Sequence, residues 1–310
     1  MKKEASPNEE LQLLKSDDIY YSPHMDWEYM SVSQFKDFEK CEAAALAKLK
    51  GEWSPPKDPI ALLVGNYVHS YFEGVKAHQD FLEKNKEKLF KKAKKADFQE
   101  ALDALDIPYK SSDTIAQLEE KLKGQPKIYG EKYSDFDVAE EMIKRLEREP
   151  FFRLVYKGER EVPIIGNLYG IKWKAKIDLL NVGHGYFIDL KTSADIHKRI
   201  FSERYGHYKS FVEAYGYDLQ IAVYEKLLEQ YYGKPFEGYI FAVSKQSPCD
   251  AEAIQIKREY KDFALNGLEG HLARVEAVKL GKEEPRMCGK CEYCRENKKI
   301  EEFKFSDDLV

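Results

Sequence analysis

Residues 159–195 read EREVPIIGNLYGIKWKAKIDLLNVGHGYFIDLKTSAD, and this stretch decides the fold class. Apolar and polar residues alternate along three segments of it, which is the period of a half-buried strand. Turn signals interrupt the alternation at Gly166-Asn167 and at Gly183-His184-Gly185. The stretch therefore predicts an antiparallel meander of three strands.

Helices and a further strand flank this meander. The pattern predicts a helix at 135–149 before it, a long helix at about 208–231 after it, and a continuous apolar strand in FEGYIFAVSK, residues 236–245. Helix, three strands, helix and strand in this order predict an α/β (α+β) fold, with a small mixed central sheet flanked by helices.

The segments before residue 151 are mainly helical in pattern. Residues 1–28 are a polar and aromatic lead-in with little periodicity. A helix capped by Ser31 or Ser33 follows and includes Cys41, and a second, apolar helix in IALLVGNYVHSYFEGVKAH (60–78) places His69 and Glu73 one turn apart.

Residues 80–130 are rich in lysine and predict a helical insertion. About 30 of these residues resemble the small helix, extended loop, helix modules of the SAP and HeH type, with Ser112 or Asp113 capping the second helix; a plain helical insertion fits equally well. The predicted divisions are 1–79 (N-terminal helical part of the core), 80–130 (insertion), 131–295 (main part of the core, with the cysteine cluster) and 296–310 (polar tail).

Composition limits the class of protein. The chain of 310 residues begins without the apolar segment of a signal peptide and has no run long enough to cross a bilayer, which predicts a cytoplasmic protein with no membrane partner. A net charge of −5 argues against nucleic-acid binding by the whole surface. Basic patches are local: 84–98, which as a charge run is most simply a solvated helix face, and the group Lys198, Arg199, Arg204 and Lys209.

An aspartate and a lysine share one face of the last meander strand. Side chains alternate along a strand, so Asp189 and Lys191 point the same way, and a turn near 183–185 brings Asp178 beside Asp189. Two neighbouring carboxylates repel unless a cation compensates them, and Mg²⁺ prefers oxygen ligands. Alternatively, both aspartates simply end strands and Lys191 is an exposed charge.

Four separated elements together resemble the PD-(D/E)xK nuclease superfamily. They are G-x3-H (Gly65 to His69), Asp178, D-x-K (Asp189 and Lys191) and Q-x3-Y (Gln220 and Tyr224), and their order is closest to the RecB-like branch. With SVSQFKDFEKC, LVGNYVHSYFEG and YDLQIAVYEKLL, the chain is most similar to RecE-type (exodeoxyribonuclease VIII-like) exonucleases of phages and prophages.

The resemblance implies a role for each matching position. His69, Asp178, Asp189 and the backbone carbonyl of Leu190 would bind Mg²⁺ or Mn²⁺. Lys191 would position or activate the attacking water, while Gln220 and Tyr224 would contact the DNA backbone; Glu161 is a weaker candidate for the acidic shell.

The resemblance also implies a function. The family degrades linear double-stranded DNA from its ends, here with 5′→3′ polarity expected, to expose single strands for homologous recombination. A RecT-like annealing recombinase is the implied partner, and a toroidal homo-oligomer is the implied assembly. A RecB-like endonuclease, of the CRISPR-adaptation or structure-specific type, and a non-catalytic DNA-binding module are the alternatives.

Three cysteines near the C-terminal end are spaced for a metal site. Cys288, Cys291 and Cys294 form C-x2-C-x2-C, and sulfur-only ligands select zinc or an iron–sulfur cluster. The fourth ligand is Cys41 or, alternatively, Cys249. An N-terminal cysteine with a C-terminal trio resembles the iron–sulfur sites of AddB-type and CRISPR-associated RecB-like nucleases, which implies [4Fe–4S]; structural Zn²⁺ and free thiols remain alternatives.

Overall fold

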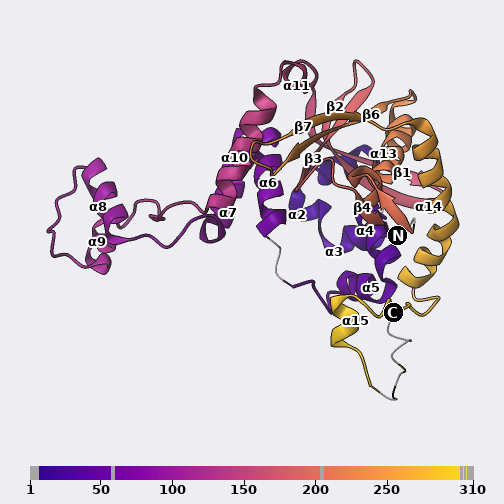
Figure 1. Ribbon diagram of the computed structural model, residues 1–310, viewed down its shortest axis with the longest axis horizontal. Helices are drawn as coiled ribbons and strands as arrows, with labels where there is room; N and C mark the ends of the chain where they lie inside the picture. The colour runs from indigo at the N-terminus through magenta and orange to yellow at the C-terminus, as the bar shows by residue number, and fades with distance from the viewer. Residues whose placement is uncertain (1–6, 57–59, 203–205, 301–302, 304, 306–310) are drawn as a thin grey trace.

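A five-stranded sheet with the strand order β1-β2-β3-β6-β7 forms the centre of the molecule in the computed structural model (Figure 1). The structure describes residues 7–56, 60–202, 206–300, 303 and 305. Strands β1 to β3 pair antiparallel, β3 and β6 pair parallel, and β7 pairs antiparallel with β6. Their bounds are β1 Glu159–Leu168, β2 Ile171–Asn181, β3 Tyr186–Ser193, β6 Glu237–Ser244 and β7 Ala251–Gln255. The predicted meander and mixed sheet are thus confirmed.

Helices cover both faces of the sheet. Successive side chains of a strand point to opposite faces, and apolar side chains on each face pack against helices. In β6, Ile240 and Ala242 join one core, whereas Phe241 and Val243 join the other. The first core includes residues of α4 (Val32–Lys40), α5 (Glu42–Lys50), α12 (Phe211–Ala214), α13 (Tyr217–Tyr232) and α14 (Arg258–Lys279). The second includes residues of α6 (Ile60–Glu73), α7 (Val75–Leu89), α10 (Ser134–Glu147) and α11 (Pro150–Val155).

Several predicted boundaries were wrong for local reasons. The first meander turn lies at Tyr169-Gly170, not at Gly166-Asn167, and both turn residues have positive φ. Gly74, with φ 151°, separates α6 from α7, and Gly216, with φ 64°, separates α12 from α13, so each predicted long helix is two helices. Ser31 is the cap of α4, and its side chain accepts from the Gln34 N–H.

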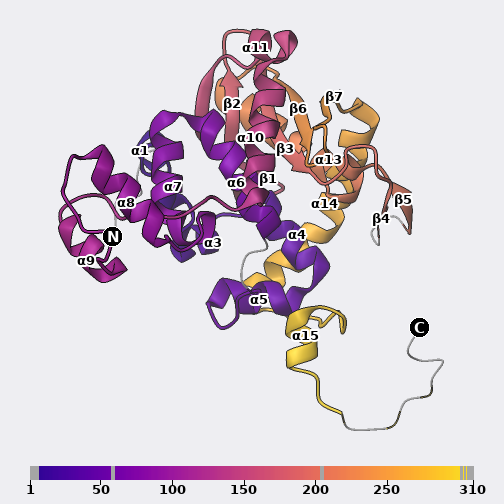
Figure 2. The ribbon, with the colours of Figure 1, turned by 60° about the vertical axis from the view of Figure 1, so that its left-hand side comes forward.

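Cys41 does not lie within a helix, as the sequence pattern suggested. It occupies the extended break between α4 and α5, with φ −164° and ψ 105°. A short hairpin that the pattern did not predict, β4 (Ile200–Ser202) and β5 (His207–Lys209), follows β3 and extends from the body (Figure 2). Arg204 of the predicted basic group lies outside the described residues.

The lead-in contains three short helices rather than irregular chain. These are α1 (Pro7–Leu13), α2 (Asp17–Tyr20) and α3 (Pro23–Glu28). Leu14, Tyr20, Met25 and Tyr29 pack into a small apolar cluster, with Ile165 of β1 packed against it. Long-range packing on the sheet therefore orders a segment that has too little periodicity of its own to predict helices.

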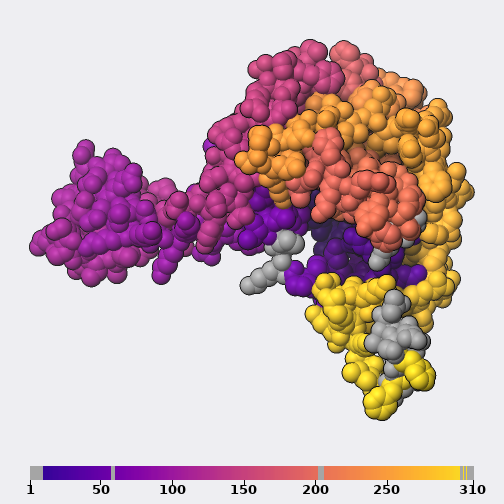
Figure 3. Space-filling model, in the orientation of Figure 1, coloured from indigo at the N-terminus to yellow at the C-terminus, as the bar shows by residue number. Residues whose placement is uncertain are grey.

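The segment between α7 and α10 extends away from the body and has a core of its own (Figures 1 and 3). Helices α8 (Lys95–Ala104) and α9 (Ile115–Lys121) pack through Phe98, Leu102, Leu118 and Leu122. Thr114, not Ser112 or Asp113, caps α9 in a capping box with Gln117. The described helices include none that is long and apolar enough to cross a membrane.

Candidate active site and cysteine cluster

The candidate active site begins where the pairing between β2 and β3 ends. The last paired residues there are Leu179 and Ile188, and the same antiparallel register continued by one residue places Asp178 opposite Asp189. The ladder opens at this point because the Asp178 Oδ2 atom accepts a hydrogen bond from the Leu190 N–H, at 2.8 Å. The fold therefore brings the two predicted carboxylates together.

Asp189 and Lys191 share one face of β3, as the strand period predicted. The Lys191 Nζ atom lies 2.6 Å from Asp189 Oδ2, and Asp189 is only 2% exposed. Burial raises the pKa of Asp189, and the neighbouring lysine opposes this rise. Burial also lowers the pKa of Lys191, but the attraction of Asp189 and Asp178 outweighs it, so the net shift is upward. Lys191 is thus an ammonium ion at neutral pH.

Helix α13 closes this face with the predicted Gln220 and Tyr224. The Gln220 Nε2 atom donates to Asp189 Oδ1 at 2.8 Å and lies 3.2 Å from the Tyr224 hydroxyl. The Lys191 Nζ atom also lies 4.8 Å from the ring centre of Tyr217. Gln220 therefore fixes the orientation of Asp189.

His69 approaches from α6, on the opposite side of the sheet. Its Nδ1 atom lies 3.6 Å from Asp178 Oδ2. Burial, reinforced by Lys191, lowers the pKa of His69 well below its usual range, so the ring is neutral at pH 7. A neutral imidazole is the form that binds metal ions.

A second set of carboxylates adjoins Asp178. Burial, followed by the charges of Asp178 and Glu73, raises the pKa of Glu161 to about 8. Lys176 forms ion pairs with Asp17 and with Glu161. Glu161 has φ 47°, a strained conformation for a residue with a side chain, and it lies on β1 beside the site.

The donor set fits a divalent cation. Asp178 and Asp189 lie side by side and Glu161 lies next to them, so three carboxyl groups line one part of the cleft. Carboxylate oxygens with a backbone carbonyl are the usual ligands of Mg²⁺ and Mn²⁺. His69, Asp178, Asp189 and the Leu190 carbonyl could hold the ion, and Glu161 stands next to them.

A cleft of about 620 Å³ gives access to this chemistry. Asp178, Asp189, Lys191, Gln220 and Tyr224 line one side of it, together with Glu161. Lys174 and Lys176 of β2 line it as well, together with residues of α2, α3, α4 and α5 and of the turns between these helices.

Lys36 of α4 is a cleft residue that the sequence analysis missed. Its Nζ atom donates to the Tyr215 carbonyl at 2.9 Å and lies 5.5 Å from the ring centre of Tyr217. Burial, and then repulsion from Lys191, lowers the pKa of Lys36 to about 8. In the sequence, Lys36 is marked only by its position next to the core residue Phe35 in α4. That position does not distinguish a lysine of the site from a lysine of the surface.

The four predicted cysteines Cys41, Cys288, Cys291 and Cys294 converge on one point. Their sulfur atoms all lie within 4.8 Å of one another. The Cys41 and Cys294 sulfurs are 3.5 Å apart, and both residues are buried. Cys249 is not part of the group, since it packs against the second core near Arg145, which donates to its carbonyl. Of the two candidates for the fourth ligand, the structure thus supports Cys41.

The cysteine group fits a thiolate-bound metal or cluster. Burial raises the pKa of the Cys288 thiol, but the N–H groups of Lys290 and Cys291 donate to its sulfur at 3.5 and 3.4 Å and bring the pKa down to about 7. Such bonds favour the thiolate, which is the form that binds zinc or iron. The helix break at Cys41 turns its side chain toward the C-terminal loop, where the Ala43 N–H donates to the Arg286 carbonyl at 3.1 Å.

Comparisons with known proteins agree with this geometry. Residues 31–297 match the model of a family described as a PDDEXK-like domain of unknown function, DUF3799. A crystal structure from Eubacterium rectale, provisionally named an exonuclease, shares 32% sequence identity at a TM-score of 0.77, covering 95% of this chain and 97% of that chain. A second structure, of SSO0001, shares 14% identity over 84% of this chain and 91% of that chain, at a TM-score of 0.28 that supports no argument. A search of curated proteins found no match.

Proposed function

This chain belongs to the DUF3799 family of PDDEXK-like domains, and on that premise we propose that it is a metal-dependent DNA exonuclease. The PDDEXK-like nuclease fold supports a nuclease activity in general. One observation carries the catalytic assignment. Asp178 and Asp189 meet where two strands separate, and Lys191 and Gln220 both contact Asp189 inside the cleft.

Each side chain has a distinct task in phosphodiester hydrolysis. A bound Mg²⁺ or Mn²⁺ would supply Lewis-acid chemistry at the scissile phosphate. Gln220 holds Asp189 in place, and neutral His69 keeps one ring nitrogen available as a ligand. Lys191, which contacts Asp189, would position or activate the attacking water and would stabilise negative charge developing on the phosphate.

The substrate, polarity, product, partner and assembly are also part of the proposal. They are supported by the resemblance to RecE-type exonucleases and by the name of the structural neighbour from E. rectale. The substrate is the end of a linear duplex, the polarity is 5′→3′, and the product is single-stranded DNA for recombination in the cytoplasm. A single-strand annealing protein would use this product, and a toroidal homo-oligomer would hold the DNA. The cysteine group would hold a [4Fe–4S] cluster or Zn²⁺ in a structural role, which iron, sulfide and zinc analysis of the purified protein distinguishes.

Digestion of end-labelled linear duplex and of covalently closed circular DNA tests the proposal. The linear DNA should be degraded with Mg²⁺, and EDTA or Lys191→Ala should abolish the loss. Lys76→Ala is the matched control, because Lys76 is a lysine on the surface of α7 with a side chain 92% exposed. Equal cutting of the circle would indicate an endonuclease, and DNA binding without cutting would indicate a non-catalytic module.

A further inference from the structure

The lead-in helices form one wall of the catalytic cleft, although they precede the part of the chain that matches the family model. That match begins at residue 31, whereas Tyr21 and Trp27 line the same cleft as Asp178 and Lys191. Tyr21 is 64% exposed and Trp27 is 39% exposed. Two large aromatic side chains therefore face the space where substrate would lie, and neither is needed for the core.

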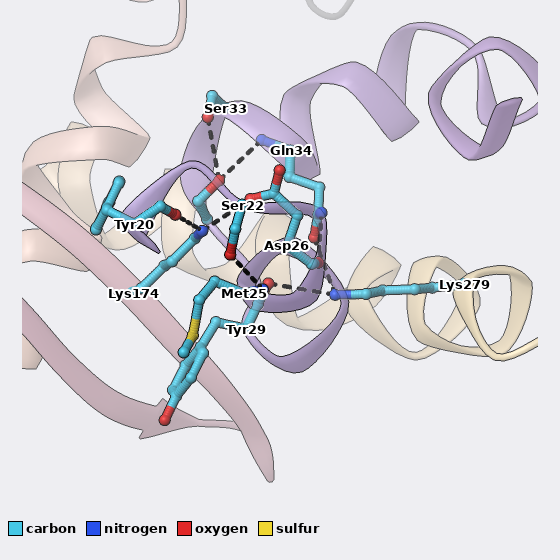
Figure 4. A network of polar contacts seen from close by, with 10 residues as sticks. Tyr20, Ser22, Met25, Asp26, Tyr29, Ser33, Gln34, Lys174 and Lys279 are labelled. Carbon is cyan, nitrogen blue, oxygen red and sulfur yellow. Dashed lines mark hydrogen bonds and ion pairs between the residues drawn. The ribbon is translucent and has the colours of Figure 1, made fainter. Parts of the chain in front are cut away.

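Two buried lysines fix this wall to the body (Figure 4). Lys174 of β2 is 2% exposed and donates to the Tyr20 carbonyl and, at 2.8 Å, to Asp26 Oδ1. Lys279 of α14 is 5% exposed and donates to the Tyr29 carbonyl at 3.2 Å. Burying lysines is costly unless they are paired, so these bonds replace the water that both ammonium groups have lost.

Further contacts hold the backbone around the two aromatic residues. The Ser22 hydroxyl accepts from the Met25 N–H and caps α3. The Tyr20 ring packs edge-on against Tyr21 with centres 4.8 Å apart, and Lys176 lies 5.3 Å from the Tyr21 ring centre. Because Lys176 also pairs with Glu161, Tyr21 is positioned directly beside the acidic part of the site.

The cleft thus combines an aromatic wall with cations. Lys36 and Lys191 both line it and suit phosphate groups. Bases of an unpaired strand expose their faces and stack on aromatic side chains, whereas bases inside a duplex are already stacked on each other. A cleft with these two features matches a single strand better than a duplex.

We propose that Tyr21 and Trp27 stack the bases of an unpaired strand beside the scissile phosphate, so that the strand to be cut enters the cleft single-stranded. This inference rests on the proposed nuclease function for the identity of the substrate. It assigns strand selection to the lead-in rather than to the catalytic side chains.

Binding measured without cleavage tests the stacking directly. The full-length Lys191→Ala protein is titrated into a fluorescent single-stranded oligonucleotide and into an abasic oligonucleotide of the same length. Tyr21→Ala and Trp27→Ala should each weaken binding of the normal strand about 5- to 150-fold. Neither change should alter binding of the abasic strand, because it keeps the phosphates and lacks the bases.

Two kinds of variant control for structure. Tyr21→Phe and Trp27→Phe keep an aromatic ring and should retain most of the affinity. Tyr260→Ala removes a tyrosine that is 43% exposed on α14 and does not line the cleft, and it should change nothing. The single strand should also quench tryptophan fluorescence, and Trp27→Phe should remove that quenching.

The outcomes separate this inference from the proposed function. Equal loss of affinity for normal and abasic strands, or no loss for either, overturns the stacking assignment. Base-dependent binding in a protein whose wild type cuts no DNA supports the stacking site and overturns the nuclease proposal alone. Cleavage of duplex ends by wild type, with unchanged binding in both alanine variants, supports the nuclease proposal and overturns the stacking assignment.

Discussion

Loss of the cysteine cluster should cost a large part of the stability of the fold. Through this cluster Cys41 and Cys294, 253 residues apart in the chain, become cross-linked when an ion or cluster is bound. For a loop of 253 residues, a cross-link removes about 5.5 kcal/mol of chain entropy from the unfolded state. We therefore expect Cys41→Ser to lower the free energy of unfolding by about 5 kcal/mol, a third or more of the total for a typical domain.

Guanidinium unfolding followed by circular dichroism measures this effect, with metal content determined on the same samples. Cys249→Ser is the matched control, since Cys249 lies apart from the cluster and should cost little beyond its local packing. Chelation of the metal from the wild type should reproduce the Cys41→Ser curve. The reasoning is refuted if Cys41→Ser protein has lost its metal and still unfolds at the wild-type midpoint, or if Cys249→Ser costs as much.

Three further perturbations test other parts of the fold. Lys174→Met should leave global stability nearly unchanged but speed hydrogen exchange in residues 7–29, because it removes the hydrogen bonds to Tyr20 and Asp26. Unchanged exchange would contradict the conclusion that Lys174 fixes these residues to the body. Burial lowers the pKa of Lys279 to about 8, so this side chain loses its proton at a lower pH in the folded state than in the unfolded state. The stability of wild type relative to Lys279→Met should therefore rise as the pH rises from about 8 to about 10.5. Thermal melts at a series of pH values measure the sign of this change. Gly238→Ala should destabilise the fold by about 1–3 kcal/mol in urea unfolding, because the new Cβ would lie 2.4 Å from Phe187 Cζ. As the contrasting control, Gly270→Ala on α14 should stabilise the fold by about 0.5–1 kcal/mol, because its Cβ would meet no atom within 4 Å.

Local periodicity was enough to predict the meander and the core of the site. The strand period places Asp189 and Lys191 on one face, and the short turn near 183–185 brings Asp178 opposite. These features depend on residues close together in the chain. The same reasoning predicted the mixed sheet, because β6 is an apolar strand following a helix.

Features that depend on distant contacts could not be read from the sequence. Lys174 alternates with apolar residues in β2 and resembles a solvent-facing lysine, yet it is buried by a segment about 150 residues earlier in the chain. Cys41 lies in a helical pattern, and only the pairing of residues 41–43 with the C-terminal loop explains the break there. Lys36 likewise becomes a site residue only through its contacts with Tyr215 and Tyr217.

The segment that carries α8 and α9 leaves and rejoins the body at one point. The Lys91 N–H donates to the Glu131 carbonyl at 2.9 Å, and the Gly130 N–H donates to the Lys91 carbonyl at 3.0 Å. Its apolar side chains pack on one another, so a change of length within the segment should leave α7 and α10 in place. An insertion or deletion there should therefore change the outer surface of the protein without displacing the side chains of the candidate active site.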